Sequence, residues 1–132
     1  MTIDGITHLS LSVVDLERSH RFYVDVLGLS VLVEPFSRDG YDEVILQVPG
    51  RGRIGLCLQA HQDNDSSSFD PSHTGLDHLA FAVPTLGELH EWAAHLDQAG
   101  VDHSGVVPNP GFGHLINLRD PDDIQVELHT LE

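Results

Sequence analysis

Near residue 10 and again near residue 80, every second residue of the chain is apolar, with small or polar residues between. Side chains on a strand point alternately to its two faces, so this alternation predicts strands over Thr7–Val13 and Leu76–Val83. The non-apolar face of the first strand carries His8 with two serines, and that of the second carries His78 with two alanines. Each histidine therefore lies among small side chains, which leave room for a cavity.

The two strands belong to an internal repeat with an offset of 70 residues. The same offset pairs further residues: Leu16 with Leu86, His20 with His90, Phe22 with Trp92, Ile54 with Ile124, and Leu58 with Leu128. A fixed offset of this kind indicates that one supersecondary unit is present twice. It also pairs Cys57 with Glu127, which are both potential metal ligands.

Each copy is predicted to contain a strand, a helix and three further strands. In the first copy the helix runs from about Leu16 to Leu27, with Asp15 as its N-cap and Gly28 at its end. The later strands and turns of this copy are predicted at Leu29–Glu34, the turn Ser37–Gly40, Asp42–Val48, the turn Pro49–Gly52, and Ile54–Gln59.

The second copy has a clearer helix start, a capping box formed by Thr85 and Glu88, and this helix is predicted to end at Gly100. Its later strands are predicted near Val101–Val107, Gly113–Arg119 and Ile124–His129. The polar segment between the copies is interpreted as an exposed linker, with a flexible lid as the alternative. We therefore expect one α+β domain over residues 1–132, with repeat 1 at about 5–60, a linker at 61–74 and repeat 2 at about 75–131.

Glu127 completes a candidate metal site with His8 and His78. It lies between the apolar residues Val126 and Leu128, where a carboxylate either faces solvent or is held by a cation. Two imidazoles and one carboxylate suit a six-coordinate divalent ion with open positions, and Fe, Mn, Ni, Co and Zn are all compatible. The prediction depends on the repeat bringing equivalent strands together.

Composition excludes several classes of protein. The formal net charge of −15, from 21 acidic and 6 basic residues, would repel a phosphate backbone, so no nucleic-acid partner is expected. No apolar run is long enough for a membrane span, and the first residues lack the features of a signal peptide. A cytoplasmic protein with no membrane partner is therefore the expectation. The single cysteine, Cys57, excludes an internal disulfide framework.

A set of short segments spread over almost the whole chain carries a family resemblance: Ile6–Leu9, Asp15–Ser19, Phe22-Tyr23, Val26–Leu29, Gly75–Phe81, and Arg119–Asp122 leading to Glu127. These segments resemble the vicinal oxygen chelate superfamily, which includes glyoxalase I, extradiol dioxygenases, fosfomycin-modifying thiol transferases and bleomycin-binding proteins. The resemblance implies two tandem βαβββ modules that form a cupped mixed sheet, the glyoxalase/dioxygenase-like fold. It also implies metal ligands on the first strand of each copy and on the final strand, which correspond to His8, His78 and Glu127.

The chain departs from the family pattern at two positions. Glyoxalase I takes a further carboxylate ligand from the position that Cys57 occupies here, so we expect three protein ligands and a cysteine that packs in the core. Asp123 stands at a turn position where the family usually has Gly or Asn, so we expect a strained turn. His129 is the first candidate for a general base beside the metal, and Gln59, His103, Phe112 and His114 are candidates for supporting roles.

Two functions of different kinds remain. In the first, the chain is a metal-dependent enzyme that binds a small substrate through two neighbouring oxygens, either as a lyase or isomerase or as an extradiol-type dioxygenase, with Glu127 and His129 as catalytic residues. In the second, it is a non-catalytic binding protein, similar to bleomycin-resistance proteins, that sequesters a cationic drug or metabolite. A homodimer is expected in both cases, since the resemblance implies it and short sheets leave open edges.

Overall fold

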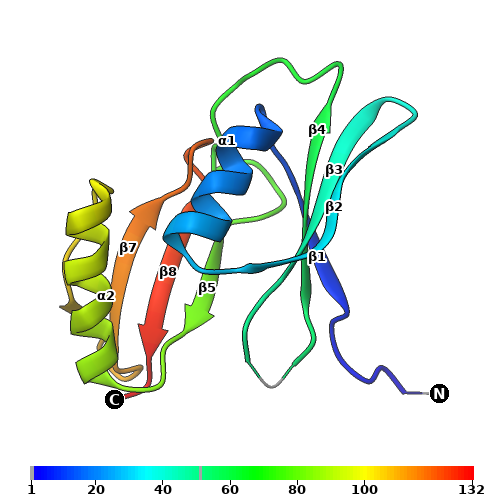
Figure 1. Cartoon of the computed structure of the whole chain (residues 1–132). Coiled ribbons are helices and arrows are strands. Elements are labelled where there is room, and N and C mark those ends of the chain that lie inside the picture. Colours follow the sequence, from blue (N-terminus) through cyan, green and yellow to red (C-terminus); the bar gives the residue numbers. More distant parts are fainter. Residues whose placement is uncertain (1, 51) are drawn as a thin grey trace. The chain divides into compact units, whose positions relative to one another are not determined.

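The computed structural model describes residues 2–50 and 52–132. The chain divides into two compact units, Met1–Ser67 and Ser68–Glu132. Each unit contains one four-stranded mixed sheet with helical residues packed against it (Figure 1). The expected fold class, α+β with two tandem βαβββ modules, is confirmed.

The first unit contains a sheet with the strand order β1-β4-β3-β2, in which β1 and β4 are parallel and the other pairs are antiparallel. Its elements are β1 (His8–Ser12), α1 (Leu16–Arg21), the π-helical turn η1 (Phe22–Val26), β2 (Ser30–Arg38), β3 (Tyr41–Gln47) and β4 (Gly55–His61).

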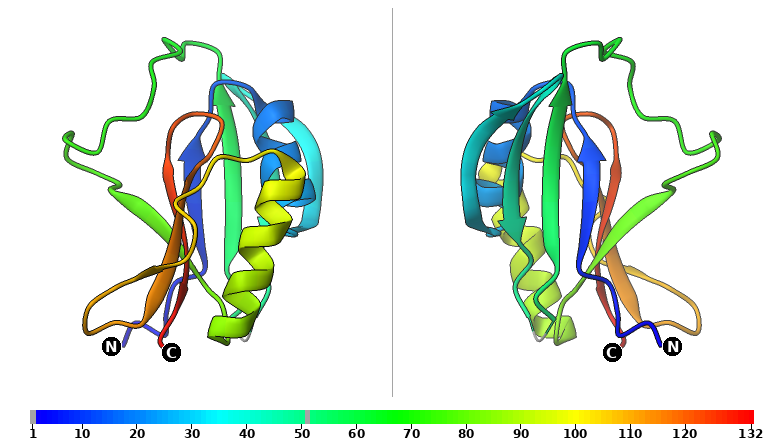
Figure 2. Two further views of the ribbon diagram at one scale, coloured as in Figure 1. Left: turned by 90° about the vertical axis from the view of Figure 1, so that its left-hand side faces the viewer. Right: turned by 90° about the vertical axis from the view of Figure 1, so that its right-hand side faces the viewer.

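The second unit repeats this order as β5-β8-β7-β6, again with one parallel pair, β5 with β8. Its elements are β5 (His78–Ala82), α2 (Leu86–Ala99), β6 (Val107–Pro108), β7 (His114–Arg119) and β8 (Gln125–Thr130). The strands and the helix of this unit can be followed from both sides in Figure 2.

The repeat offset of 70 residues holds in the strand pairing as well as in the sequence. His8 pairs with Gly55 in the first unit, and His78 pairs with Gln125 in the second. Two residues further along, β1 pairs with Cys57 and β5 pairs with Glu127. Cys57 and Glu127 are therefore structural equivalents, as the sequence predicts.

The helix of the first unit differs from its prediction, because only Leu16–Arg21 is α-helical. Its start is as expected, with the Asp15 side chain accepting a hydrogen bond of 2.8 Å from the Arg18 amide. The predicted remainder is the π-helical turn η1, in which the Leu27 amide bonds to the Phe22 carbonyl five residues back. Two adjacent aromatic side chains of this turn, Phe22 and Tyr23, are both buried.

The helix of the second unit agrees with its prediction. The Thr85 hydroxyl accepts from the Glu88 amide, as expected of an N-cap residue, and it donates to the Glu88 carboxylate. The helix ends at Gly100, whose φ of +68° is the left-handed conformation that favours glycine. Leu89 and Leu96 on its inner side are fully buried.

Several predicted strand limits are wrong. Most of Val101–Val107 is irregular, with a two-residue strand at its end and a single bridge from His103 to Leu118. Ser37 and Arg38 belong to β2, so the first turn is confined to Asp39 and Gly40. Strand β4 extends to His61, beyond the predicted end at Gln59, because it keeps pairing with β3 as far as Tyr41.

Two turn predictions have different outcomes. The strained turn at Asp123 is confirmed by its φ of +66°. The predicted turn Pro49–Gly52 includes Arg51, which lies outside the described residues. Among the residues that are described, no helix is both long and apolar enough to cross a membrane.

Candidate metal centre

His78 begins β5 and is fixed by the residue before it. Its Nδ1 lies 2.6 Å from Oδ1 of Asp77. A carboxylate only accepts hydrogen bonds, so Nδ1 carries a proton, and in the neutral ring Nε2 has a free lone pair. A carboxylate behind a histidine orients the ring and makes the other nitrogen a better metal ligand. The His78 side chain is 40% exposed.

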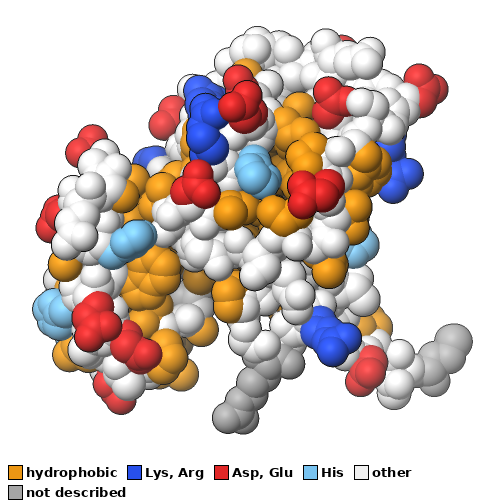
Figure 3. All heavy atoms as spheres, viewed as in Figure 1, with side chains coloured by type: hydrophobic (Ala, Val, Ile, Leu, Met, Phe, Trp, Pro, Cys, Tyr) orange, Lys and Arg blue, Asp and Glu red, His pale blue; other side chains and the backbone are white. Residues whose placement is uncertain are grey.

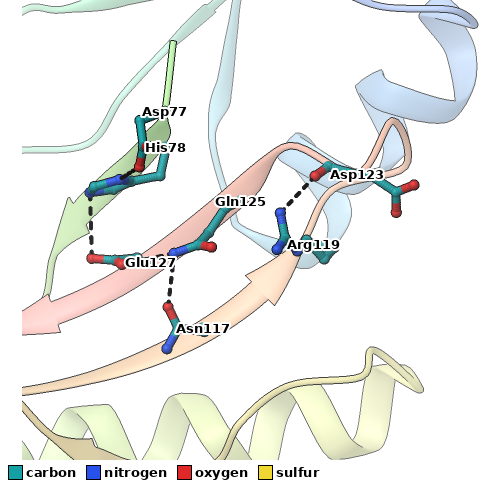
Figure 4. Close-up of polar contacts among 7 residues, drawn as sticks. All are labelled: Asp77, His78, Asn117, Arg119, Asp123, Gln125 and Glu127. Atoms are coloured by element: carbon teal, nitrogen blue, oxygen red, sulfur yellow. Dashed lines mark hydrogen bonds and ion pairs between the residues drawn. The ribbon is translucent and has the colours of Figure 1, made fainter. Parts of the chain in front are cut away.

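Glu127 lies on β8, the parallel neighbour of β5, and it faces this nitrogen. Its Oε2 is 3.8 Å from Nε2 of His78. Its other oxygen, Oε1, accepts a hydrogen bond of 3.1 Å from the Gln125 amide nitrogen, which also lies 3.2 Å from Oδ1 of Asn117. This chain of contacts holds the carboxylate in place and leaves Oε2 directed at His78 (Figure 4).

The distance between the two free atoms fits a shared metal ion. Imidazole nitrogen and carboxylate oxygen bind such ions at about 2.1 Å, so two ligands of one ion lie at most about 4.2 Å apart. The 3.8 Å between Nε2 of His78 and Oε2 of Glu127 is within this limit. Within residues 2–50 and 52–132, no three His, Cys, Asp or Glu side chains are grouped closely enough to hold an ion. The second unit thus brings together two of the three predicted ligands.

His8, the third predicted ligand, belongs to the first unit. Its Nδ1 lies 3.0 Å from the hydroxyl of Thr7, which is the equivalent of Asp77 by the repeat offset. Its strand partner is Gly55, where an added Cβ would lie 3.3 Å from the Cβ of His8. A side chain at position 55 would therefore crowd the Cβ of His8. Nε2 of His8 is left without a hydrogen bond from the described residues.

Cys57 has the surroundings of a neutral thiol. It is buried, and this burial raises the pKa of the Cys57 thiol. The hydrogen bond with Ser10 lowers the pKa, whereas the charge of Glu43 and the hydrogen bond with it raise the pKa further. Metal ions bind the thiolate form. The environment of Cys57 therefore favours the expectation that it packs in the core and does not bind the metal.

His129, the candidate general base, lies on the same face of β8 as Glu127. Its Nε2 is 2.6 Å from the carbonyl oxygen of Phe112. A carbonyl oxygen only accepts, so Nε2 carries the proton and Nδ1 is the nitrogen that is free to take one.

The other candidates have local partners. His103 uses both ring nitrogens, with Nε2 at 3.2 Å from Asp97 and Nδ1 accepting from the Gly105 amide at 3.0 Å. Nδ1 of His114 lies 2.6 Å from the Glu132 carbonyl oxygen, and the Phe112 side chain is exposed. The Gln59 amide donates to Glu43 at 3.0 Å.

The sequence prediction missed three residues around Glu127 and His78, namely Asp77, Asn117 and Gln125. Two of them had a usable signal, because Asp77 directly precedes His78 and Gln125 is two residues before Glu127 on the same strand face. Asn117 had none, since its contact with Gln125 depends on the pairing register of β7 with β8.

Comparison with known proteins identifies the family of this fold. The sequence matches the family model of the Glyoxalase/Bleomycin resistance protein/Dioxygenase superfamily over residues 5–128. The chain belongs to this superfamily. A crystal structure of a glyoxylase/bleomycin resistance protein/dioxygenase domain from Frankia sp. EAN1pec superposes with a TM-score of 0.88 and 30% identity, and covers 98% of each chain.

Two sequence relatives of this superfamily member span most of its length. The uncharacterised protein YwkD of Bacillus subtilis (strain 168) is 28% identical over 98% of both chains. Metallothiol transferase FosB of Staphylococcus saprophyticus is 31% identical over 97% of this chain and 78% of its own. The resemblance stated from the sequence segments is thus confirmed at the level of the superfamily.

Proposed function

We propose that the chain is a divalent-metal-dependent enzyme that binds a small substrate through two neighbouring oxygens. In this proposal His8, His78 and Glu127 hold one ion. The observation that carries it is the pair of free atoms, Nε2 of His78 and Oε2 of Glu127, which lie 3.8 Å apart. The second polar atom of each side chain is engaged, by Asp77 and Gln125 respectively, so both free atoms are positioned for a common ligand.

The chemistry of the donor set supports an enzyme. Two imidazoles and one carboxylate leave positions open on a six-coordinate ion, and Fe, Mn, Ni, Co and Zn all accept such ligands. When bound, the ion supplies a Lewis acid to the two substrate oxygens. Both a lyase or isomerase and an extradiol-type dioxygenase use this arrangement, and glyoxalases and dioxygenases both give their names to the superfamily.

The residues of the chain supply the remaining steps. Glu127 would bind the ion through Oε2, because Oε1 accepts a hydrogen bond from Gln125. This hydrogen bond holds the carboxylate in one orientation. His129 is proposed as the general base, because Nδ1 is free to accept a proton from the substrate while Nε2 donates to the Phe112 carbonyl. That hydrogen bond keeps the ring in the tautomer that a base requires.

One observation favours a second candidate, a non-catalytic binding protein for a cationic drug or metabolite. The formal net charge of −15 attracts cations, although it also promotes solubility. Figure 3 shows acidic side chains spread over the face that is drawn, with basic side chains few and apart. Stoichiometric metal distinguishes the two candidates, since a pure binding role does not require an ion.

The test is the metal content of the purified protein and of His78→Ala. We expect about one divalent ion per chain in the wild type and none in the variant, because the loss of Nε2 removes a ligand but no core side chain. The matched control is His90→Ala, at an exposed position of α2, which should retain the metal. Full metal content in both His78→Ala and Glu127→Gln would refute the proposal.

The reaction class is then tested on the same preparations. Anaerobic reconstitution with Fe(II), Mn(II), Ni(II), Co(II) and Zn(II) is followed by assays on a panel of catechols, hemithioacetals and epoxides. Turnover with any of the panel that is lost in His78→Ala and retained in His90→Ala supports an enzyme. A protein that is purified without metal and turns over none of them supports the binding role.

A further inference from the structure

The first unit contains a second group of interacting side chains, on the same sheet face as His8. Directly paired residues of a sheet share a face, and so do every second residue along a strand. Strand β1 places His8 opposite Gly55, and from there this face continues along β4 to Gln59 and His61. Across β3 and β2 the same face carries the following residues: Tyr41, Glu43, Phe36 and Arg38.

Glu43 is the buried centre of this group. Its side chain is 6% exposed, yet both oxygens have donors: Nε of Arg38 lies 3.0 Å from Oε2, and the Gln59 amide lies 3.0 Å from Oε1. Burial alone would raise the pKa of Glu43, but the hydrogen bonds from Gln59 and Arg38 outweigh it and lower the pKa. The carboxylate is therefore ionised at neutral pH.

Arg38 is the exposed partner of this ion pair. Its side chain is 54% exposed, and its guanidinium carbon lies 4.9 Å from the centre of the Phe36 ring. Guanidinium has five N–H donors, of which the Nε donor is used by Glu43. In the part of the chain that the structure describes, no residue accepts a hydrogen bond from Nη1 or Nη2 of Arg38. A cation with a fixed orientation thus presents unused donors to solvent.

Stability alone gives a weak reason for this arrangement. A half-exposed ion pair contributes little to folding, whereas burying a carboxylate is costly unless its hydrogen bonds are complete. An apolar residue at position 43 would fill the space at lower cost. A guanidinium held by a buried carboxylate is, however, well suited to bidentate recognition of an oxyanion.

Aromatic rings lie beside the guanidinium on the same face. Tyr41 is the direct strand partner of both Arg38 and His61, and the Tyr41 and His61 rings are 5.0 Å apart at an angle of 38°. Such rings provide a flat apolar surface next to the donors of Arg38. The combination fits a ligand that has an unsaturated body and a negatively charged end.

We infer that Arg38, oriented by Glu43, binds the carboxylate or phosphonate end of a small ligand, with Tyr41 and His61 packing against its planar part. This site is separate from the proposed metal ligand of the same sheet, because His61 lies six residues along β4 from Gly55, the strand partner of His8. It selects anionic ligands in a chain whose net charge would otherwise repel them. Arg38 is then the ligand-binding residue and Glu43 a positioning residue.

The test is the binding of benzoate and phenylphosphonate to the full chain, measured by calorimetry, with benzamide as the neutral probe. We expect both anions to bind and benzamide to bind at least about tenfold more weakly, since hydrogen bonds to charged groups are worth at least this factor. Arg38→Gln should lose about tenfold or more in benzoate affinity. Arg21→Gln, which makes the same charge change at a surface ion pair with Glu17, should leave the affinity unchanged.

The His78→Ala variant separates this inference from the metal proposal. Benzoate should bind to it as to the wild type if Arg38 is the anion site, whatever the metal content of either protein. Loss of benzoate binding in His78→Ala with retention in Arg38→Gln would overturn the inference, because the anion would then be bound at the metal. Failure of the wild type to bind either anion would overturn it as well.

Glu43→Gln tests the positioning role. Removal of a negative charge should by itself strengthen anion binding, whereas loss of the orienting carboxylate should weaken it. We expect weaker benzoate binding, together with faster solvent exchange of the Arg38 Nε proton in NMR spectra. Tighter binding with an unchanged exchange rate would show that Glu43 does not orient Arg38.

Discussion

At the scale of single residues, the two histidines differ in the side chain that holds Nδ1. His78 has the carboxylate of Asp77 at 2.6 Å, and His8 has the hydroxyl of Thr7 at 3.0 Å. A carboxylate raises the basicity of the other ring nitrogen more than a hydroxyl does. Of the two imidazoles, His78 is therefore the stronger donor for a metal ion.

The first prediction at this scale concerns Asp77. Asp77→Asn should lower metal affinity by about 10–100-fold, which is the usual effect of losing a carboxylate behind a histidine ligand. Affinity is measured by competition with a chelator. Asp97→Asn is the matched control. Asp97 also contacts a histidine, with Oδ1 at 3.2 Å from Nε2 of His103, but His103 is not one of the proposed ligands. Equal affinities for Asp77→Asn and the wild type would contradict the prediction.

The second prediction concerns Cys57. Cys57→Ser should keep metal affinity within a few-fold, because the new hydroxyl has a similar volume and is able to donate to Glu43 as the thiol does. The Co(II)-substituted wild type should show no thiolate-to-metal absorption band. A large loss of metal in Cys57→Ser, or the presence of that band, would identify Cys57 as a ligand.

At the scale of elements, the turn before β7 lies directly against the backbone at the end of β8, and this close contact requires glycine at position 113. Gly113 has a φ of +89°, and an added Cβ there would collide with the carbonyl oxygen of Thr130 at the end of β8. Gly111 has a similar φ of +84° but no atom within 4 Å of such a Cβ. An alanine at position 111 would therefore introduce backbone strain alone, whereas an alanine at position 113 would add a steric collision.

The third prediction uses this pair. Gly111→Ala should lower the free energy of unfolding by about 1–2 kcal/mol, the cost of a left-handed conformation for a residue with a Cβ. Gly113→Ala should cost a further 1–3 kcal/mol or so, because the backbone has to shift as in an overpacked core. Urea unfolding measures both. Equal losses of unfolding free energy in the two variants would contradict the prediction, because the end of β8 would then move away from the added Cβ at no measurable cost.

Secondary structure was predictable where a local signal exists. Asp15, Thr85 and Gly100 mark helix ends through their own side chains or backbone, and all three positions are confirmed. The π-helical turn and the irregular segment before Val107 had no such signal, since both depend on packing with residues distant in the sequence. Strand limits shift for the same reason, as β4 continues for as long as β3 provides a partner.

The candidate site was also predictable only in part. Equivalence of Cys57 with Glu127 followed from the repeat, because a fixed offset in sequence becomes a fixed register in two similar sheets. The hydrogen bonds from Gln125 to Glu127 and from Arg38 to Glu43 depend on side-chain rotamers and on the pairing of neighbouring strands. Such contacts leave no periodic trace in the sequence.

At the scale of the whole molecule, each sheet has two edge strands, β1 and β2 in one and β5 and β6 in the other. Edge strands carry backbone groups without a partner on one side, which favours association. Strand β2 also exposes two large apolar residues, Leu32 and Val33. These features are the basis for the proposed homodimer.

The fourth prediction is a homodimer in solution. Light scattering at micromolar concentration should give about twice the chain mass of 14.5 kDa, because pairing of edge strands or burial of their apolar residues stabilises association. Leu32→Lys should weaken the dimer, since a charge on an edge strand opposes pairing. A wild-type mass that stays at that of a single chain over a dilution series would contradict the prediction.

The offset of 70 residues that relates β1 and β4 to β5 and β8 means that the chain contains its own pairwise alignment for these strands. Where both halves agree, as at His8 and His78 or at Leu58 and Leu128, the same side chain stands at the same register position of two sheets. Where they differ, as at Cys57 and Glu127, one register position carries a buried thiol in one sheet and a carboxylate in the other. Each half is therefore a reference for the other, and a substitution at such a position can be compared with the residue that its equivalent already holds.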